Sequence, residues 1–200
     1  AYQHVKTFCE NNAANCAYSL KVFEIESNDT WARDHGPISV LKDGEYHLLD
    51  FNFNAWGNKF SHEKDNRINA TLYSLSAFSP RTMQQINFVL EGGAIESDGD
   101  GTLMTTEACM LNPNRNGLIT KDACESQLKA FFGVHNIAWV NAGYLAGDDT
   151  DSHIDTLARF APDNTIVYVK CSDPSDEHFE SLNSMEQCLQ QLKNANSKPY

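Results

Sequence analysis

One nine-residue segment gathers acidic side chains around a single histidine: residues 147–155 read GDDTDSHID. If the segment is a strand, Asp149, Asp151, His153 and Asp155 point to one face, because side chains alternate along a strand. Carboxylates crowded on one face repel one another and lose hydration, so such a face favours a bound cation. The segment is therefore a candidate site, and the alternative is a solvated, acidic edge strand.

Two other segments present a carboxylate where the chain must leave regular structure. Asp34 lies just before Gly36 and Pro37, which suits a carboxylate presented from a loop. The alternative is a turn or capping aspartate beside a core tryptophan. Glu91 follows an apolar run and precedes two glycines, which let a ligand or another backbone approach closely. Here the alternative is a plain turn glutamate.

These side chains together suit a guanidinium group. Asp34, Glu91 and Asp155 would offer acceptors to its five N–H donors, which lie in a planar fork. Trp31 would flank its plane or its alkyl tail. His153, set among acids, would hold its proton longer than a free imidazole and act as a general acid toward a leaving amine. The residues therefore predict chemistry at a guanidinium carbon.

The elements that must position these residues repeat along the chain. Each repeat has a short apolar strand, an acidic stretch, a hairpin and a helix. The repeats are residues 20–78, 86–133 and 137–194, preceded by the helix of an earlier repeat at 1–15. Asp34, Glu91 and His153 fall at matching points of the repeats. We therefore expect an α/β fold, a pseudo-symmetric propeller of β-β-β-α units whose loops meet at a shared centre.

Local signals give bounds for the elements of each repeat. The opening strands are expected at 20–25, 86–90 and 137–140, the hairpin turns at 43–44, 98–101 and 161–164, and the helices at 62–78, 120–133 and 176–194. Propellers close with about four to eight blades, so three leave the ring open. We expect residues 1–200 to be one incomplete catalytic domain, completed by further chain or by association into a homo-oligomer.

The composition favours one globular domain, with 41% hydrophobic residues in 200 and no apolar run long enough to span a membrane. The net charge of −12 argues against nucleic acid as a partner and favours a small cation. The six cysteines include no CxxC pair, so we expect reduced, mostly buried thiols in a cytoplasmic protein and no structural zinc site.

Long segments of the chain resemble the agmatine deiminases, within the bacterial peptidylarginine deiminase group of guanidine-modifying enzymes. The segments are NDTWARDHGP at 28–37, DFNFNAWGNKF at 50–60, FVLEGGAIESDGDGTLMTTEACMLNPNRN at 88–116 and GDDTDSHIDTLARF at 147–160. The resemblance implies a five-bladed α/β propeller, of which this chain would hold about three blades. It also implies that Asp34 and Asp155 clamp the guanidinium, that Glu91 assists, that His153 is the acid and base, and that Trp31 lines the substrate channel.

The resemblance also implies a reaction. In that family a cysteine thiolate attacks the guanidinium carbon, ammonia leaves, and water hydrolyses the thiouronium intermediate, so agmatine becomes N-carbamoylputrescine without a metal or organic cofactor. The family's nucleophile lies in a GGGNIHC segment, which this sequence lacks. Cys109 and Cys171 are expected to be strand residues rather than substitutes. We therefore do not expect catalysis by this chain alone.

Other functions stay open. Asp151, His153 and Asp155 have the Asp-x-His-x-Asp spacing that binds paired metals in binuclear manganese ureohydrolases, although the companion GGDH segment is missing. A noncatalytic binder of guanidinium compounds is a further alternative. Peptidyl-arginine or free arginine is an alternative substrate. The choice among them and agmatine depends on the residues that bind the end of the substrate opposite the guanidinium.

Overall fold

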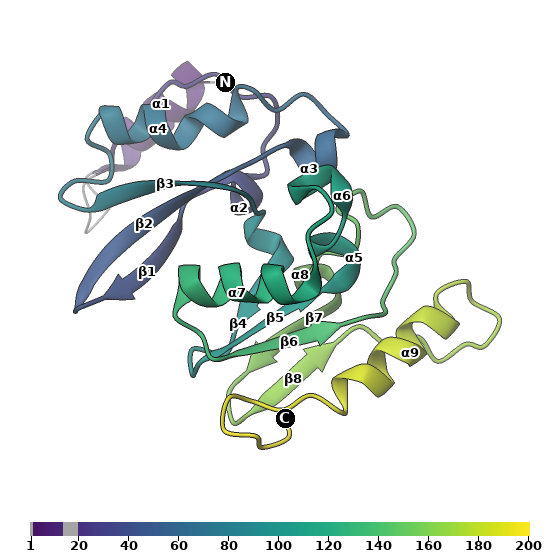
Figure 1. The fold of residues 1–200 in the computed structure, drawn as a ribbon. Coiled ribbons are helices and arrows are strands. Elements are labelled where there is room, and N and C mark those ends of the chain that lie inside the picture. Colours follow the sequence, from purple (N-terminus) through teal and green to yellow (C-terminus); the bar gives the residue numbers. More distant parts are fainter. Residues whose placement is uncertain (1, 14–19) are drawn as a thin grey trace.

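Three β-hairpins organise the part of the chain that the computed structural model describes, residues 2–13 and 20–200 (Figure 1). Their strands are β1 (Ile38–Lys42) with β2 (Glu45–Asn52), β4 (Ile95–Ser97) with β5 (Thr102–Thr106), and β7 (Ala158–Ala161) with β8 (Thr165–Tyr168). In the first turn, Asp43 and Gly44 have φ angles of 53° and 81°, as a two-residue turn between twisted strands requires. All three hairpin turns agree with the sequence prediction.

The strand that opens each later repeat completes the sheet of the repeat before it. β3 (Thr82–Val89) pairs in parallel with β2, and β6 (Asn136–Val140) pairs in parallel with β5. Two parallel neighbours need a crossover, which a helix supplies here. By sheet pairing the unit is therefore β-β-α-β, while the predicted order of strand, hairpin and helix along the chain is present in the second and third repeats. Residues 20–25 form no strand, because no described strand lies beside them to pair with their backbone.

The helices of the units follow the predicted order. α7 (Lys121–Phe132) begins and ends as predicted, because Thr120 accepts a hydrogen bond from the Ala123 amide and Gly133 takes the left-handed conformation. α4 (Ile68–Ser74), preceded by the single turn η2 (Asp65–Arg67), and α9 (Phe179–Leu189) are shorter than predicted. α4 ends where Ser76 adopts a positive φ, and α9 begins after Asp176 caps a turn at His178.

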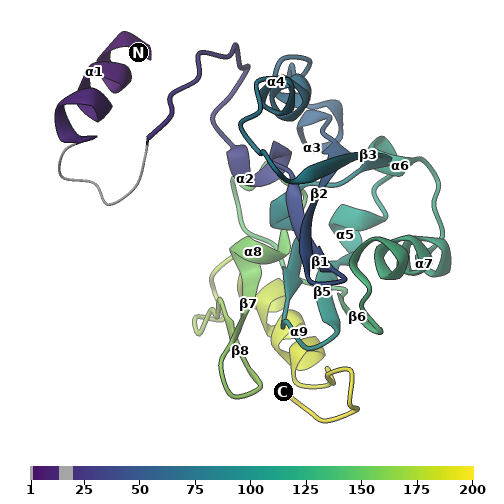
Figure 2. The same ribbon diagram turned by 90° about the vertical axis from the view of Figure 1, so that its left-hand side faces the viewer.

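Short helical turns fill the connections. They are α2 (Ala32–His35), α3 (Ala55–Asn58), η3 (Gly92–Ala94), α5 (Glu107–Met110), α6 (Pro113–Asn116) and α8 (Ile154–Leu157). α1 (Tyr2–Asn12) has no buried residue and stands apart from the sheets in Figure 2; the end of the predicted helix at 1–15 lies outside the described residues. None of the described helices is both long and apolar enough to cross a membrane.

Two apolar clusters fix the hairpins relative to one another. The first joins the first two sheets to α7 and includes Phe51, Phe88, Leu103, Leu128 and Trp139. The second joins the middle sheet to α8 and α9 and includes Met104, Val140, Ile154, Leu157 and Met185. Because each cluster spans two neighbouring units, the short turn η3 is held in contact with both α2 and α8.

Candidate active site

Asp34, His153 and Asp155 converge on one glycine. A Cβ atom added to Gly93 would lie 2.6 Å from His153 Nδ1, 2.8 Å from Asp155 Oδ2 and 2.8 Å from Asp34 Oδ1. Asp34 comes from α2, Gly93 from η3, and His153 and Asp155 from the start of α8. The structure thus brings together residues 59 and more positions apart in the sequence, and a hydrogen atom is the only side chain that fits among them.

The carboxylate of Asp34 is buried and held from both sides. The Gly93 amide donates to its Oδ1 at 3.0 Å, and Trp56 Nε1 donates to its Oδ2 at 3.1 Å. Trp56 lies in α3, where φ is positive at every residue from Ala55 to Asn58, and the Asn54 side chain caps this turn by accepting from Gly57. Sequence analysis gave Trp56 no role. Its only signal was its place in a segment that carried the family resemblance.

His153 lies between two carboxylates and is almost completely buried, with 1% of its surface exposed. Its Nδ1 is 3.6 Å from Asp34 Oδ1, and its Nε2 is 4.0 Å from Glu91 Oε2. Nε2 has no hydrogen-bond partner in the described structure. Buried polar atoms are nearly always paired, so an unpaired ring nitrogen indicates a position prepared for a proton transfer or for a ligand.

Asp155 is half-buried beside these groups. Burial raises the pKa of its carboxyl; His153 opposes the rise, and the neighbouring Asp34 carboxylate adds to it. Two close carboxylates in a partly dehydrated site therefore favour a cation that can bind both. The predicted convergence of Asp34 and Asp155 is present in the structure.

Glu91 is occupied by a guanidinium of the protein itself. Arg115 Nε donates to both of its carboxylate oxygens, at 3.0 and 2.9 Å, and neither side chain is exposed. Glu91 thus lies behind His153, with its oxygens paired. Arg115 was not predicted as a site residue, although Asn112 and Pro113 are a helix-start signal for α6, the turn that carries it.

Arg115 also holds the acidic segment 147–155 in place. Its Nη1 donates to Asp151 Oδ2 at 3.1 Å, and its Nη2 donates to the Thr150 carbonyl at 2.8 Å. Lys59 Nζ donates to Asp151 Oδ1 at 2.7 Å. Burial alone would raise the pKa of Asp151, but hydrogen bonds from Lys59 and Arg115 outweigh burial and lower it. The positive charge that balances Asp151 therefore comes from Lys59 and Arg115 of the chain itself, and not from a bound ion.

The acidic segment is a series of turns, so its alternating side chains do not share one face as they would in a strand. Asp151 and Ser152 have φ angles of 63°, and Asp148 accepts hydrogen bonds from the amides of Thr150 and Ser152. Aspartate side chains that bond the following amides stabilise turns. As a result Asp151 faces Arg115 while Asp155 faces Gly93. The Asp-x-His-x-Asp spacing does not form one metal site here, which removes the support for a manganese ureohydrolase.

A pocket of about 420 Å³ opens over these residues. Asp34, His153 and Asp155 line it together with further ionisable side chains and three aromatic rings: Asp29, Arg33, Asp148, Asp149, Trp31, Trp56 and Phe60. Trp31, expected to line a substrate channel, is 56% exposed. Carboxylates beside aromatic rings suit a small organic cation, because the rings contact both its charge and its alkyl part.

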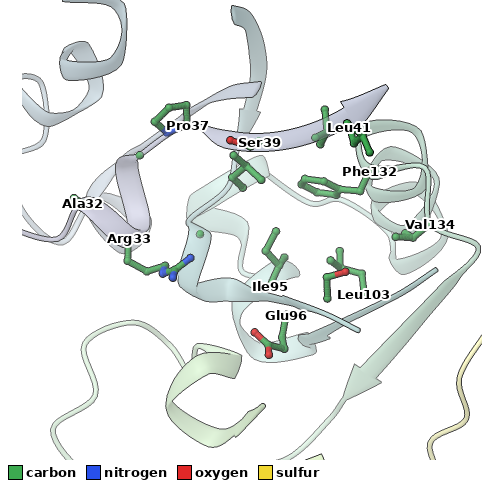
Figure 3. Close-up of a pocket in the computed structure, with 15 residues that line it drawn as sticks. Ala32, Arg33, Pro37, Ser39, Leu41, Ile95, Glu96, Leu103, Phe132 and Val134 are labelled. Carbon is green, nitrogen blue, oxygen red and sulfur yellow. The ribbon is translucent and has the colours of Figure 1, made fainter. Parts of the chain in front are cut away.

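A second, larger hollow of about 830 Å³ lies between β1 and the β4–β5 hairpin (Figure 3). Its labelled side chains are mostly aliphatic or aromatic, among them Leu41, Ile95, Leu103 and Phe132. The one carboxylate in it, Glu96, is paired with Arg159 at 2.8 Å. Because this hollow brings together no second ionisable acceptor or histidine, we assign the chemistry to the smaller pocket.

The prediction that Cys109 and Cys171 lie in strands was wrong. Cys109 lies in α5 and is fully buried, and Cys171 follows β8, so neither is a strand residue. Burial raises the pKa of the Cys109 thiol, which disfavours its thiolate. Cys109 lies near Glu91 and His153: one ligand atom of each is within 4.8 Å of the others, the one group of potential metal ligands among the described residues.

The repeated hairpin units and the polar site that they share define a mixed α/β protein. A family model described as Porphyromonas-type peptidyl-arginine deiminase matches residues 1–200. The chain belongs to this family, as the sequence resemblance predicted. It is 33% identical to an agmatine deiminase of Pseudomonas syringae pv. tomato over 188 residues, which are 91% of this chain and 50% of that protein.

Solved structures agree with the family assignment. An agmatine deiminase variant of C. jejuni with substrate bound has a TM-score of 0.84 and 40% sequence identity, covering 93% of this chain and 55% of that one. An agmatine deiminase of Enterococcus faecalis has a TM-score of 0.81 and 27% identity, covering 97% and 54%. The chain spans about half the length of the curated relatives that it matches.

Proposed function

We propose that this chain carries the substrate-binding and acid–base part of an agmatine deiminase, which hydrolyses the guanidinium of agmatine to N-carbamoylputrescine and ammonia. The observation that carries the proposal is the convergence of Asp34, His153 and Asp155 on Gly93 within an aromatic pocket. Relatives named agmatine deiminase, from Pseudomonas syringae and from Medicago truncatula, support it.

Each residue then has a role that follows from its surroundings. Asp34 and Asp155 accept N–H bonds from the two edges of the guanidinium, whose positive charge relieves their mutual repulsion. His153, beside both, gives a proton to the leaving amine and takes one from the attacking water. Trp31 covers the alkyl chain at the rim. Glu91 does not grip the substrate; with both oxygens on Arg115, it orients and polarises His153.

The covalent step needs a group that these 200 residues lack. In the reaction that the family resemblance implies, a cysteine thiolate attacks the guanidinium carbon, the C–N bond breaks as ammonia takes a proton from His153, and water then cleaves the C–S bond. Cys109 is a poor candidate for this thiolate, because it is fully buried and its raised pKa keeps it protonated. We propose that the nucleophile belongs to the full-length protein outside this chain.

The fold proposal goes with the function. Three successive units, each presenting one short turn to the same site, are what three blades of a five-bladed α/β propeller would provide. Residues 1–200 would then form one catalytic domain only in part, which either further chain or a homo-oligomeric partner completes.

The test is an assay of the full-length protein with agmatine, measuring ammonia and N-carbamoylputrescine. We expect turnover of agmatine. Asp34→Ala and Asp155→Ala should each lower kcat/KM by about tenfold to a hundredfold or more, because each leaves the bound guanidinium without one of its carboxylate partners. Free arginine and peptidyl-arginine, assayed in parallel, decide the substrate. Faster turnover of either would reassign it, and near-normal kcat/KM in either variant would refute the site.

A further inference from the structure

Behind the pocket lies a cluster of metal-binding side chains that the proposed reaction does not use as a unit. Glu91 precedes η3, Cys109 lies in α5, and His153 precedes α8, and a ligand atom from each lies within 4.8 Å of the other two. The exposed fractions of Glu91, Cys109 and His153 are 0%, 0% and 1%. Only His153 also lines the pocket.

An unpartnered ring nitrogen points into this cluster. His153 Nε2 has no hydrogen-bond partner and lies 4.0 Å from Glu91 Oε2. Glu91 Oε2 accepts a hydrogen bond from Arg115 Nε at 2.9 Å, but a carboxylate oxygen has a second lone pair. The ring nitrogen and the carboxylate oxygen thus both have capacity left for an ion between them.

We propose that Glu91, Cys109 and His153 form an inhibitory binding site for a zinc-class divalent ion. Thiolate, imidazole and carboxylate are the ligands that Zn²⁺ takes in proteins, and three protein ligands with one open position are a common arrangement. A thiolate ligand selects against Mg²⁺ and Ca²⁺, which prefer oxygen. The site joins three loops: those of Glu91 and Cys109 flank the β4–β5 hairpin, and that of His153 precedes the β7–β8 hairpin. The ion would therefore also fix these two units to one another.

The groups around the cluster partly compensate the charge that zinc binding adds. Zinc binding replaces the S–H bond of Cys109 by an S–Zn bond and releases the proton to solvent. Burial and the nearby carboxylates raise the pKa of the Cys109 thiol, so its thiolate forms only when the ion binds, with the Arg115 guanidinium also favouring the anion. The thiolate offsets one of the two charges of the ion, and the other is shared with Arg115 around the Glu91 carboxylate, while Arg115 remains paired with Asp151.

Zinc at this position removes the acid–base group of the proposed reaction. With zinc on Nε2, the Nδ1 atom beside Asp34 carries the single proton of a neutral imidazole, so the ring cannot take up the second proton that the general acid needs. Zinc should therefore inhibit the deiminase, and this part of the inference rests on the proposed function. Binding itself does not, because it needs only the three ligands.

The test measures metal binding by the full-length protein, with Co²⁺ as a spectroscopic probe and Zn²⁺ in equilibrium dialysis. Cobalt bound to Cys109 gives a thiolate-to-metal charge-transfer band, which zinc should displace. Cys109→Ser should abolish the band and weaken zinc binding by at least about tenfold. The matched control is Cys124→Ser: Cys124 is also buried, in α7, and belongs to no such cluster. It should keep the band and the affinity.

Two outcomes overturn the site. One is a band of unchanged intensity in Cys109→Ser, which would place the metal on another cysteine, and the other is no band in the wild type. If Cys109→Ser does not fold, the position of zinc is measured by anomalous scattering from zinc-soaked crystals of the wild type. The inference then requires zinc to be bound to Cys109 Sγ. A protein that binds zinc there but releases no ammonia from agmatine would refute the proposed function and leave the zinc site standing.

Discussion

Arg115 Nε donates to both carboxylate oxygens of Glu91, at 3.0 and 2.9 Å, and both side chains are fully buried. A guanidinium of the chain therefore lies behind the site that we propose for the guanidinium of a substrate. The same arginine bonds Asp151 and the Thr150 carbonyl. Through it, the position of the loop that carries His153 depends on the position of Glu91.

The first prediction concerns this buried pair. Arg115→Met should lower the free energy of unfolding by about 3–5 kcal/mol, because it leaves the Glu91 carboxylate buried without a partner. Urea unfolding measures the change. The control is Arg159→Met, which breaks the pair with Glu96 at 2.8 Å; Arg159 is 53% exposed, so its loss should change the free energy by less than about 1 kcal/mol. Equal effects of the two substitutions would contradict the structural role given to Arg115.

The second prediction concerns Gly93. Gly93→Ala should abolish measurable binding of guanidinium compounds in calorimetry, because the added methyl group must displace Asp34, Asp155 or His153, each within 2.8 Å of it. Gly93 has no left-handed φ, so alanine introduces no backbone strain there. Gly99→Asn, in an open turn with no atom within 4 Å of an added Cβ, is the control and should bind normally. Normal binding by Gly93→Ala would show that the three groups do not form the binding site.

Local signals in the sequence were enough for much of the fold. Asp43 and Gly44 predicted a hairpin turn, and Thr120 and Gly133 predicted the ends of α7, because turns and helix caps depend on residues only a few positions apart. Which strand completes each sheet could not be predicted, for the opposite reason. The parallel partner of β2 is β3, which lies across a helix, and nothing local in the sequence specifies that pairing.

The candidate site shows the same division. Asp34, His153 and Asp155 could be selected from their types and from the glycine and proline residues around them, and the structure brings them together. The pairing of Arg115 with Glu91 spans 24 positions and two loops, so no spacing rule reveals it. Residues 147–155 could have been a strand or consecutive turns, because alternating aspartates suit both, and Arg115 and Lys59 stabilise the turn form by binding Asp151.

The third prediction concerns pH. Burial raises the pKa of Asp155 above its usual value. A guanidinium binds the ionised carboxylate, so binding lowers that pKa again, and the affinity is fully present above the pKa of the free protein. It should fall as the pH drops through this raised pKa. Calorimetric titration of agmatine between neutral and acid pH measures the effect.

The variant Asp155→Asn should bind more weakly at neutral pH and lose this part of the pH dependence. Asp163→Asn is the matched control, because Asp163 lies in the exposed turn between β7 and β8 and its left-handed conformation suits asparagine. It should keep the wild-type pH profile. A profile of Asp155→Asn that follows the wild type would assign the pH dependence to another group.

The fourth prediction concerns the contact between Trp56 and Asp34. Trp56 Nε1 donates to Asp34 Oδ2 at 3.1 Å, while its ring packs edge-on against Phe53 and Phe60, with centroids 5.4 and 5.8 Å away. Trp56→Phe keeps an aromatic ring in the pocket wall and removes the donor. Hydrogen bonds to charged groups contribute about 1.5–3 kcal/mol, so kcat/KM for agmatine should fall by about tenfold to a hundredfold in the full-length protein.

The control for Trp56→Phe is Trp31→Phe, because the Trp31 side chain is exposed at the rim and makes no hydrogen bond to Asp34. The Trp31 carbonyl, which accepts from the Asp34 amide, is unchanged in this variant. It should change kcat/KM less than Trp56→Phe and mainly through KM, since it touches only the alkyl part of the substrate. If Trp56 positions Asp34, its loss should lower kcat as well, because a carboxylate free to rotate holds the guanidinium less firmly against His153. Equal effects of the two substitutions would mean that both tryptophans only cover the substrate.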